Sequence, residues 1–152
     1  MAAFSLGDRP VGSDGPPYVI AEAGVNHNGD LDLAEDLVDA AAAAGADAVK
    51  FQTFSADRLV TDDAPTADYQ QEQTGAESQR DILEQYELDR GAHERLQAYC
   101  HEQEITFLST PFDPESVDML VDLGVPALKL GSGEHDNYPV LNHAAGTGLP
   151  LI

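Results

Sequence analysis

The sequence contains very little positive charge. Its 152 residues include 28 Asp and Glu but only 7 Lys and Arg, which gives a formal net charge of −21. A nucleic-acid groove or an anionic membrane needs clustered basic residues on the protein, and none are clustered here. We therefore expect neither a nucleic acid nor a membrane among the partners. The acidic residues are spread along helix-like segments, which is typical of a solvated surface adapted to high salt.

Cysteine and long apolar runs are also scarce. Cys100 is the only cysteine, which excludes an intrachain disulfide framework and a cysteine metal site. No signal-peptide pattern or membrane-length apolar run is found in the sequence, so we expect a cytoplasmic protein. Hydrophobic residues make up 42% of the chain, enough for one compact domain with a core.

The hydrophobic pattern predicts strands that alternate with helices. Around Gly7 two short β-like pieces predict a hairpin, and residues 1–17 are interpreted as hairpin and connector. A long polar stretch is predicted over 55–78. The predicted strands are 18–24, 48–54, 106–110 and 127–133; the predicted helices are 31–44, 79–104 with a break near Asp89, 113–124 and 139–145; residues 149–152 look like the start of a fifth strand.

This alternation favours a parallel sheet, closed as a barrel or wound in both directions. A doubly wound nucleotide fold should have a G-x-G-x-x-G turn after its first strand, and GVNHNGD lacks that spacing. We therefore predict an α/β fold, the N-terminal half of a TIM (β/α)8 barrel. A complete barrel takes about 250 residues, so residues 18–152 are interpreted as a partial barrel of four βα units and the start of a fifth strand.

The two lysines, Lys50 and Lys129, both lie within short apolar strand-like stretches. Because side chains alternate along a strand, Val49, Phe51 and their equivalents are expected to face the helices. Glu22, Lys50, Gln52 and Lys129 then face the barrel interior near the carboxyl ends of their strands, where catalytic groups lie in this fold. Two converging ammonium groups suit a small anion such as a phosphate or carboxylate. The alternative is a structural ion pair between Glu22 and a lysine, with no ligand.

Hydroxyl groups and a carboxylate follow the neighbouring predicted strands. Ser109 and Thr110 end the third strand, and Ser132 follows Lys129 in a glycine-flanked turn that could hold phosphate oxygens. Glu134 comes directly after this turn and is a candidate acid or base.

The histidines carry weaker signals. His27 and His135 lie in predicted loops at the same end of the strands and are interpreted mainly as turn residues, with metal binding or proton transfer as the alternative. His93 and His101 are expected on helix surfaces.

Four stretches carry a family resemblance: IAEAGVNHNGD, AVKFQTF, FLSTPFDPESVDMLVDLGVPALKLGSGE and PVLNHAAGTGLPLI. Together they resemble the N-terminal half of the N-acetylneuraminate (sialic acid) synthase family, which includes legionaminic and pseudaminic acid synthases. The resemblance covers nearly the whole chain from Tyr18 onward. It implies a TIM-barrel enzyme that condenses phosphoenolpyruvate with an N-acetylmannosamine-type sugar to a nonulosonic acid, consuming water and releasing phosphate.

Position by position, the resemblance also implies roles for individual residues. Phosphoenolpyruvate would be bound by Lys50, Thr110, Lys129 and Ser132. Gln52 would contact the sugar, an N-acetylated hexose, and Glu22 and Glu134 would be the catalytic carboxylates. The polar stretch from Tyr69 is somewhat more similar to the legionaminic and pseudaminic versions than to sialic acid synthase.

The resemblance further implies a divalent metal, Mn or Mg, whose histidine ligands lie outside this chain, and a homodimer. Residues 1–152 alone are expected to be an inactive fragment, because an open half-barrel leaves strand edges unpaired. Two alternatives stay open: an aldolase that forms a Schiff base on Lys50 or Lys129, and a non-catalytic, truncated barrel that only binds an anion.

Overall fold

The computed structural model describes residues 4–7, 9–12, 15–60 and 79–152. Most of the predicted polar stretch, residues 61–78, lies outside the described residues. In chain order the elements are β1 (Phe4–Leu6), β2 (Arg9–Val11), β3 (Ile20–Gly24), α1 (Leu31–Ala43), β4 (Ala48–Thr53), α2 (Ala56–Leu59), α4 (Gln79–Tyr86), α5 (Arg90–Glu102), β5 (Thr106–Pro111), α6 (Pro114–Leu123), a 3-10 turn (Ser132–Glu134) and α7 (Tyr138–Gly146).

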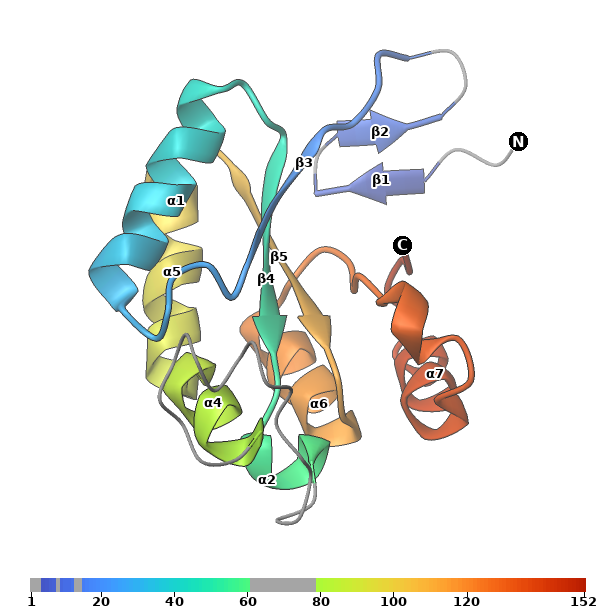
Figure 1. Cartoon of the computed structure of the whole chain (residues 1–152). Helices are drawn as coiled ribbons and strands as arrows, with labels where there is room; N and C mark the ends of the chain where they lie inside the picture. Colours follow the sequence, from blue (N-terminus) through green and yellow to red (C-terminus); the bar gives the residue numbers. More distant parts are fainter. Residues whose placement is uncertain (1–3, 8, 13–14, 61–78) are drawn as a thin grey trace.

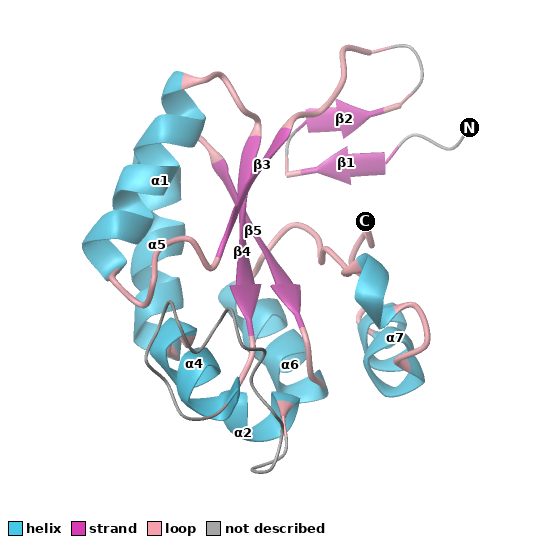
Figure 2. Ribbon diagram, in the orientation of Figure 1, coloured by secondary structure: helices cyan, strands magenta, loops and turns pink. Residues whose placement is uncertain are grey.

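Three strands form a parallel sheet in the order β3-β4-β5, and β1 pairs with β2 in a separate antiparallel hairpin. Figure 1 shows α1 and α5 side by side on one face of the sheet, with the hairpin near the opposite end from α2 and α4. Strands and helices alternate as predicted (Figure 2). The α/β class and the N-terminal hairpin are confirmed; the domain boundary between residues 17 and 18 stays a prediction.

The two faces of the sheet contribute to two separate apolar clusters. Val49, Phe51 and Phe107 point outward and pack under the helices in the main core, together with Val38 and Leu96. The opposite face, the barrel interior, has a small apolar cluster at the amino ends of the strands, built from Leu6, Ala48, Leu108 and Ala127. Leu6 of the hairpin is 3% exposed and covers this end. The predicted inward and outward sides of β4 are therefore confirmed.

Aspartate side chains cap the N-termini of α1, α5 and α6. The side chain of Asp30 accepts hydrogen bonds from the backbone N–H groups of Asp32 and Leu33, which caps α1. Asp89 caps α5 in the same way, so the predicted break between α4 and α5 is confirmed. Gly124 ends α6 with φ of +75°, a left-handed conformation that glycine adopts without strain.

The predicted fourth strand, 127–133, does not form as a regular strand. Only Leu128 makes a parallel bridge, to Leu151, and Ser132 already lies in the 3-10 turn. Its link to β5 is one long hydrogen bond, from the Lys129 N–H to the Ser109 carbonyl at 3.4 Å. On its other side the segment is bonded more closely: the Leu128 and Leu130 N–H groups donate to the Pro150 and Ile152 carbonyls, and the Ile152 N–H donates to the Leu128 carbonyl, at 2.8 to 3.0 Å. The segment is therefore extended as far as Leu130 and then enters the 3-10 turn.

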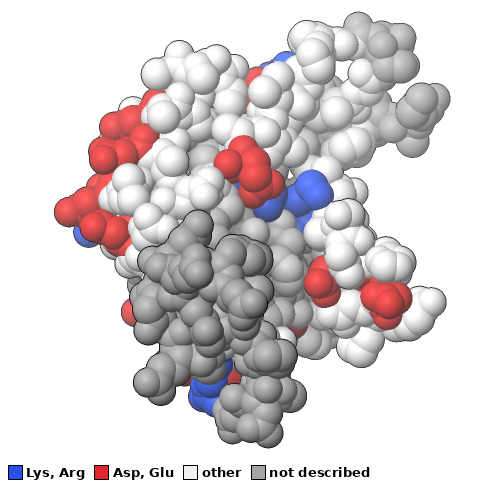
Figure 3. All heavy atoms as spheres, in the orientation of Figure 1, with Lys and Arg blue, Asp and Glu red and all other residues white. Residues whose placement is uncertain are grey.

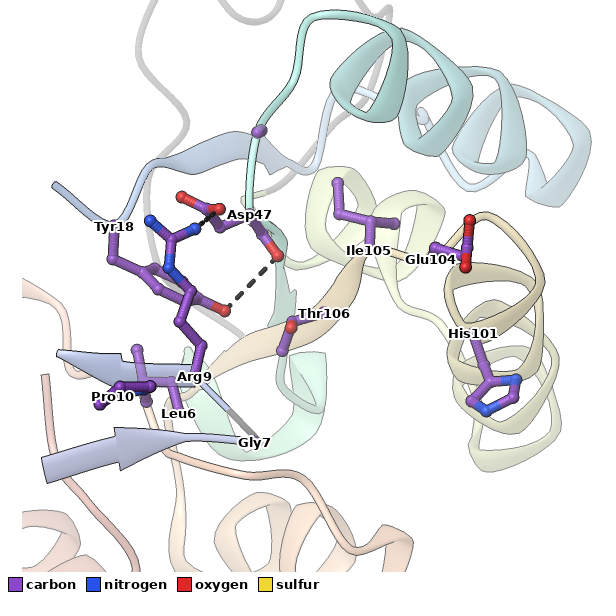
Figure 4. Close-up of a pocket in the computed structure, with 11 residues that line it drawn as sticks. Leu6, Gly7, Arg9, Pro10, Tyr18, Asp47, His101, Glu104, Ile105 and Thr106 are labelled. Carbon is purple, nitrogen blue, oxygen red and sulfur yellow. Dashed lines mark hydrogen bonds and ion pairs between the residues drawn. The ribbon is translucent and has the colours of Figure 1, made fainter. Parts of the chain in front are cut away.

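A hollow of about 760 Å³ lies at the amino ends of the strands (Figure 4). Arg9 of β2 pairs with the carboxylate of Asp47 and stacks over the Tyr18 ring at 5.2 Å. The Asp47 carboxylate also accepts the Val19 N–H at 2.7 Å. These contacts tie the hairpin to the sheet, and this end of a (β/α) barrel serves stability. No helix among the described residues is long and apolar enough to span a membrane.

Candidate active site

A cavity of about 420 Å³ lies at the carboxyl ends of the strands, at the opposite end of the barrel interior from the hairpin. It brings together six of the seven residues to which the family resemblance gives roles; Glu134 is the one left out. Its lining consists of Glu22, Gly24, Val25, Asn26, Lys50, Gln52, Thr110, Phe112, Lys129, Gly131 and Ser132. The barrel interior is therefore apolar at its amino end and polar at its carboxyl end.

Lys50 is the most enclosed of these polar residues, at 5% exposure. Its Nζ lies 2.8 Å from Glu22 Oε1 and 2.9 Å from Thr110 Oγ1, and donates weakly to the Phe51 carbonyl at 3.5 Å. Glu22 and Lys50 are paired residues in the register of β3 and β4, which explains how their side chains meet. Three oxygen acceptors thus surround the Lys50 ammonium group, which fixes the position of its charge in the cavity wall.

Lys129 is half-buried and lines the same cavity. Its Nζ donates to the neighbouring Leu130 carbonyl at 2.8 Å. No carboxylate among the described residues forms an ion pair with it, in contrast to Lys50. Its positive charge is therefore available to an anion in the cavity, and the ion-pair alternative accounts for Lys50 but not for Lys129.

Gly24 separates two side chains of the site. A Cβ at this position would lie 3.5 Å from Glu22 Oε1 and 3.8 Å from Gln52 Nε2, so both groups project over it. Its φ of +57° also favours glycine, and the β3–β4 register shifts between Glu22 and Gly24. This local irregularity brings the Glu22 carboxylate over the cavity, where its side chain is 60% exposed.

Ser132 lines the cavity from the 3-10 turn, but Glu134 does not. The Glu134 carboxylate instead accepts the Asn137 side-chain amide at 2.6 Å. Glu134 is half-buried beside the cavity, with its Cγ 3.7 Å from where a Cβ on Gly131 would stand. To act on a molecule in the cavity it would have to give up or share this contact with Asn137.

Sequence reasoning did not select Asn26 and Phe112 for the site. Both line the cavity, Asn26 just after β3 and Phe112 just after β5. Their position at the carboxyl ends of β3 and β5 was the available signal, since Glu22, Lys50 and Thr110 lie at the same edge of the sheet. Asn26 was instead interpreted as a turn residue; its N–H does donate to the Ala23 carbonyl at 3.1 Å.

The structure moves Ser109 away from the predicted anion site. Ser109 and Thr53 point to the helix side of the sheet, where their hydroxyl oxygens are 2.6 Å apart. Alternation along the strand explains this, because Thr110 occupies the inward position. Only Thr110 of the predicted hydroxyl pair therefore reaches the cavity.

The expectation that His93 lies on a helix surface is wrong. It is 1% exposed, with its ring against Phe107 and its Nε2 2.8 Å from Thr53 Oγ1. Burial lowers its pKa below the usual 6.5. His101 is exposed, as expected.

His27 is a turn residue, as interpreted, but a fully buried one. Its Nδ1 accepts the Gly29 N–H at 3.0 Å, which leaves the ring proton on Nε2. That Nε2 has no hydrogen-bond partner among the described residues. Burial, and then the nearby His93, lower the pKa of His27.

The charged surface is uneven. Figure 3 shows acidic side chains gathered over α1, and basic atoms beside acidic ones in the hollow at the centre of that face. On α1, Asp32, Asp36 and Asp39 are exposed. Within the described ranges, no group of three or more His, Cys, Asp or Glu side chains is arranged to hold a metal ion.

Comparison with known proteins gives consistent relatives. N,N'-diacetyllegionaminic acid synthase of Legionella pneumophila is 49% identical over 147 residues, covering 96% of this chain and 41% of the relative. The structure of the sialic acid synthetase from Leptospira borgpetersenii matches 99% of this chain and 48% of its own, with 31% identity and a TM-score of 0.80. The spore coat polysaccharide biosynthesis protein SpsE of Bacillus subtilis matches 99% of this chain and 39% of its own, with 39% identity and a TM-score of 0.77.

The chain thus spans about 40 to 50% of the length of these relatives. The model described as the NeuB family matches residues 37–152, which includes most of the candidate site. The resemblance inferred from the four motifs is therefore confirmed, and the chain belongs to the NeuB family.

Proposed function

We propose that this chain supplies the phosphoenolpyruvate-binding part of a synthase that condenses phosphoenolpyruvate with an N-acetylmannosamine-type sugar. The observation that carries the proposal is the convergence of Lys50 and Lys129 on one cavity that also contains Thr110 and Ser132. Phosphoenolpyruvate has a phosphate and a carboxylate, and two lysines with two hydroxyls match those groups. The names of the relatives, which are nonulosonic acid synthases, support the same reaction.

In the proposed reaction, C3 of phosphoenolpyruvate attacks the aldehyde carbon of the open-chain sugar, and a carbon–carbon bond forms. The aldehyde oxygen takes up a proton and becomes a hydroxyl. Water adds at C2 and loses its protons, and the bond between C2 and the phosphate oxygen breaks, which releases inorganic phosphate and leaves a ketone at C2. Lys50 and Lys129 would hold the anionic groups in place, while Gln52 would orient the sugar. Glu22 is suited to remove a proton from the attacking water, because its exposed carboxylate reaches over the cavity beside Lys50.

The role of Glu134 is proposed more narrowly. Its carboxylate lies outside the cavity lining and contacts Asn137, so a part in proton transfer requires it to turn toward the substrate. A divalent metal also belongs to the reaction that the family resemblance implies. The residues described here do not form a metal site by themselves, so no step above depends on one, and ligands from elsewhere in the complete protein stay a prediction.

The proposal is tested by phosphate release from phosphoenolpyruvate by the complete protein that contains residues 1–152. A panel of N-acetylated hexoses should be offered, with and without manganese. We expect phosphate release only with an acceptor sugar, and we expect Lys129→Met to lower kcat/KM by about 100-fold or more. Arg95→Met is the matched control, because Arg95 pairs with Glu35 on the helix surface and does not line the cavity. Sugar-independent release, or equal losses in both variants, would contradict the proposal.

The Schiff-base aldolase is the alternative with a specific prediction. A nucleophilic lysine needs a free lone pair, whereas the Lys50 Nζ is surrounded by three oxygen acceptors. Lys129 donates to the Leu130 carbonyl and is proposed above to bind an anion as a charged ammonium group. We therefore expect that borohydride treatment of the complete protein with pyruvate leaves Lys50 and Lys129 unmodified. A reduced pyruvate adduct on either lysine, found by peptide mass spectrometry, would favour the aldolase.

A further inference from the structure

A line of buried hydrogen bonds runs behind the candidate site, on the helix side of the sheet. Ser109 Oγ lies 2.6 Å from Thr53 Oγ1, and Thr53 Oγ1 lies 2.8 Å from His93 Nε2. His93 Nδ1 lies 2.9 Å from the carbonyl oxygen of Asp89, the residue that caps α5. The three side chains are between 0 and 2% exposed. None of them lines the cavity.

The direction of every bond in this line follows from its last acceptor. A carbonyl oxygen only accepts, so His93 Nδ1 carries the ring proton and donates it to Asp89. Nε2 of the neutral ring must then accept the Thr53 hydroxyl proton, and Thr53 in turn accepts from Ser109. The lowered pKa of His93, caused by burial, keeps the ring neutral near pH 7. The line therefore has one fixed hydrogen-bond direction, from Ser109 to Asp89.

The line crosses the sheet directly behind two cavity residues. Gln52 and Thr110 are partners in the register of β4 and β5, and they point into the cavity. Thr53 follows Gln52, and Ser109 precedes Thr110, so their hydroxyl bond joins the two strands on the opposite face. His93 then fixes that junction to the N-terminal turn of α5. Movement of either strand end would shift Thr110 relative to Lys50, to which it is hydrogen-bonded at 2.9 Å.

We propose that His93, Thr53 and Ser109 are positioning residues that hold the ends of β4 and β5 in the spacing at which Lys50 and Thr110 bind one phosphate group. This inference rests on the proposed function, because it concerns the same cavity. Misplacement of a binding group by a fraction of an ångström weakens binding without removing any group that touches the ligand. Removal of the Thr53 or Ser109 hydroxyl, which we call loss of the hydroxyl line, should therefore weaken phosphoenolpyruvate binding while the protein stays folded.

The test compares Thr53→Val, which keeps the shape but removes the hydroxyl, with Thr53→Ser, which keeps the hydroxyl. In the complete protein, Kd for phosphoenolpyruvate is measured by calorimetry and KM and kcat by phosphate release. We expect Thr53→Val and Ser109→Ala to raise Kd and KM about tenfold with kcat per folded molecule almost unchanged, and Thr53→Ser to stay within about twofold of wild type.

A core variant separates positioning from general stability. Leu96→Val removes a methylene from a buried residue of the same helix, one turn from His93, without touching the hydroxyl line. It should lower the melting temperature but leave Kd unchanged. Equal losses in Leu96→Val and Thr53→Val, or equal losses in Thr53→Ser and Thr53→Val, would overturn the proposal.

A measurement on the unaltered protein keeps the inference testable if a variant does not fold. Nitrogen-15 NMR of the histidine side chains should find His93 with its proton on Nδ1 and an unprotonated Nε2. A proton on Nε2 would reverse the line and overturn the proposal. If wild type does not bind phosphoenolpyruvate, the proposed function fails and this inference fails with it; if wild type binds and the valine variant binds equally well, only this inference fails.

Discussion

At the scale of single residues, strand alternation allowed the candidate site to be predicted. The chain has only two lysines, and their place among apolar residues indicated that both point inward. The ion-pair and hydrogen-bond partners of the two lysines could not be predicted in the same way. That Glu22 pairs with Lys50 while Lys129 has only the Leu130 carbonyl depends on strand register and on the shape of the 129–134 segment. The buried state of His93 depends likewise on which face of α5 meets Thr53.

The buried histidines give a prediction for pH. The folded pKa values of His27 and His93 lie below their ordinary value of 6.5. As the pH falls through that value, the unfolded chain takes up protons that the folded chain does not, so the free energy of unfolding decreases. The stability that the neutral histidines contribute to the folded state is fully present above about pH 6.5 and is lost progressively below that pH. The melting temperature of wild type should therefore fall relative to that of His93→Gln between pH 7.5 and 5. A constant difference between the two would contradict this.

At the scale of elements, local capping chemistry was the most informative signal. Asp30 and Asp113 each precede a predicted helix and cap it, and Asp89, predicted only as a break, caps α5. The segment 127–133 was predicted incorrectly because its apolar alternation suits a strand, whereas strand formation depends on neighbours far away in the chain. Among the described residues, β5 contributes one long hydrogen bond to this segment, whereas residues 150–152 contribute three around the Leu128–Leu151 bridge.

Asp113 gives a prediction for an individual cap. Burial would raise its pKa, but hydrogen bonds from the hydroxyl and N–H of Ser116, with the ion pair to Arg58, outweigh burial and lower it. Asp113→Ala should destabilise the protein by about 1–2 kcal/mol through loss of the cap. The side chain of Asp113→Asn can still accept the Ser116 N–H, so this variant should lose clearly less stability than Asp113→Ala. Denaturant midpoints for the two variants measure this; equal losses would mean that the charge, and not the cap, is what matters.

At the scale of the whole molecule, the fold separates stability from binding along the axis of the partial barrel. The hairpin closes the amino end through Leu6 and the Arg9–Asp47 ion pair, and the polar cavity opens at the carboxyl end. The α/β class could be predicted from the alternation of strand-like and helix-like hydrophobic patterns along the sequence. That alternation could not predict the cavity's shape, because residues such as Phe112 and Gly131 come together only after the sheet forms.

The acidic surface gives a prediction for salt. Twenty-eight acidic side chains against 7 basic ones repel one another, and dissolved ions screen that repulsion. We expect the melting temperature of the complete protein to rise as potassium chloride increases into the molar range. Sucrose at a concentration that stabilises by exclusion serves as the uncharged control. A flat or falling curve with potassium chloride would contradict a surface adapted to high salt.

The central claim is that Lys50 and Lys129 hold one small anion between them. A double-mutant cycle tests it most directly, with Kd for phosphoenolpyruvate measured by calorimetry on wild type, Lys50→Met, Lys129→Met and the double variant. If both lysines bind the same molecule, each single variant should lose at least about tenfold in affinity, and the double variant should lose more than either one. Unchanged affinity in either single variant, or a double variant that binds as tightly as one of the single variants, would contradict the claim.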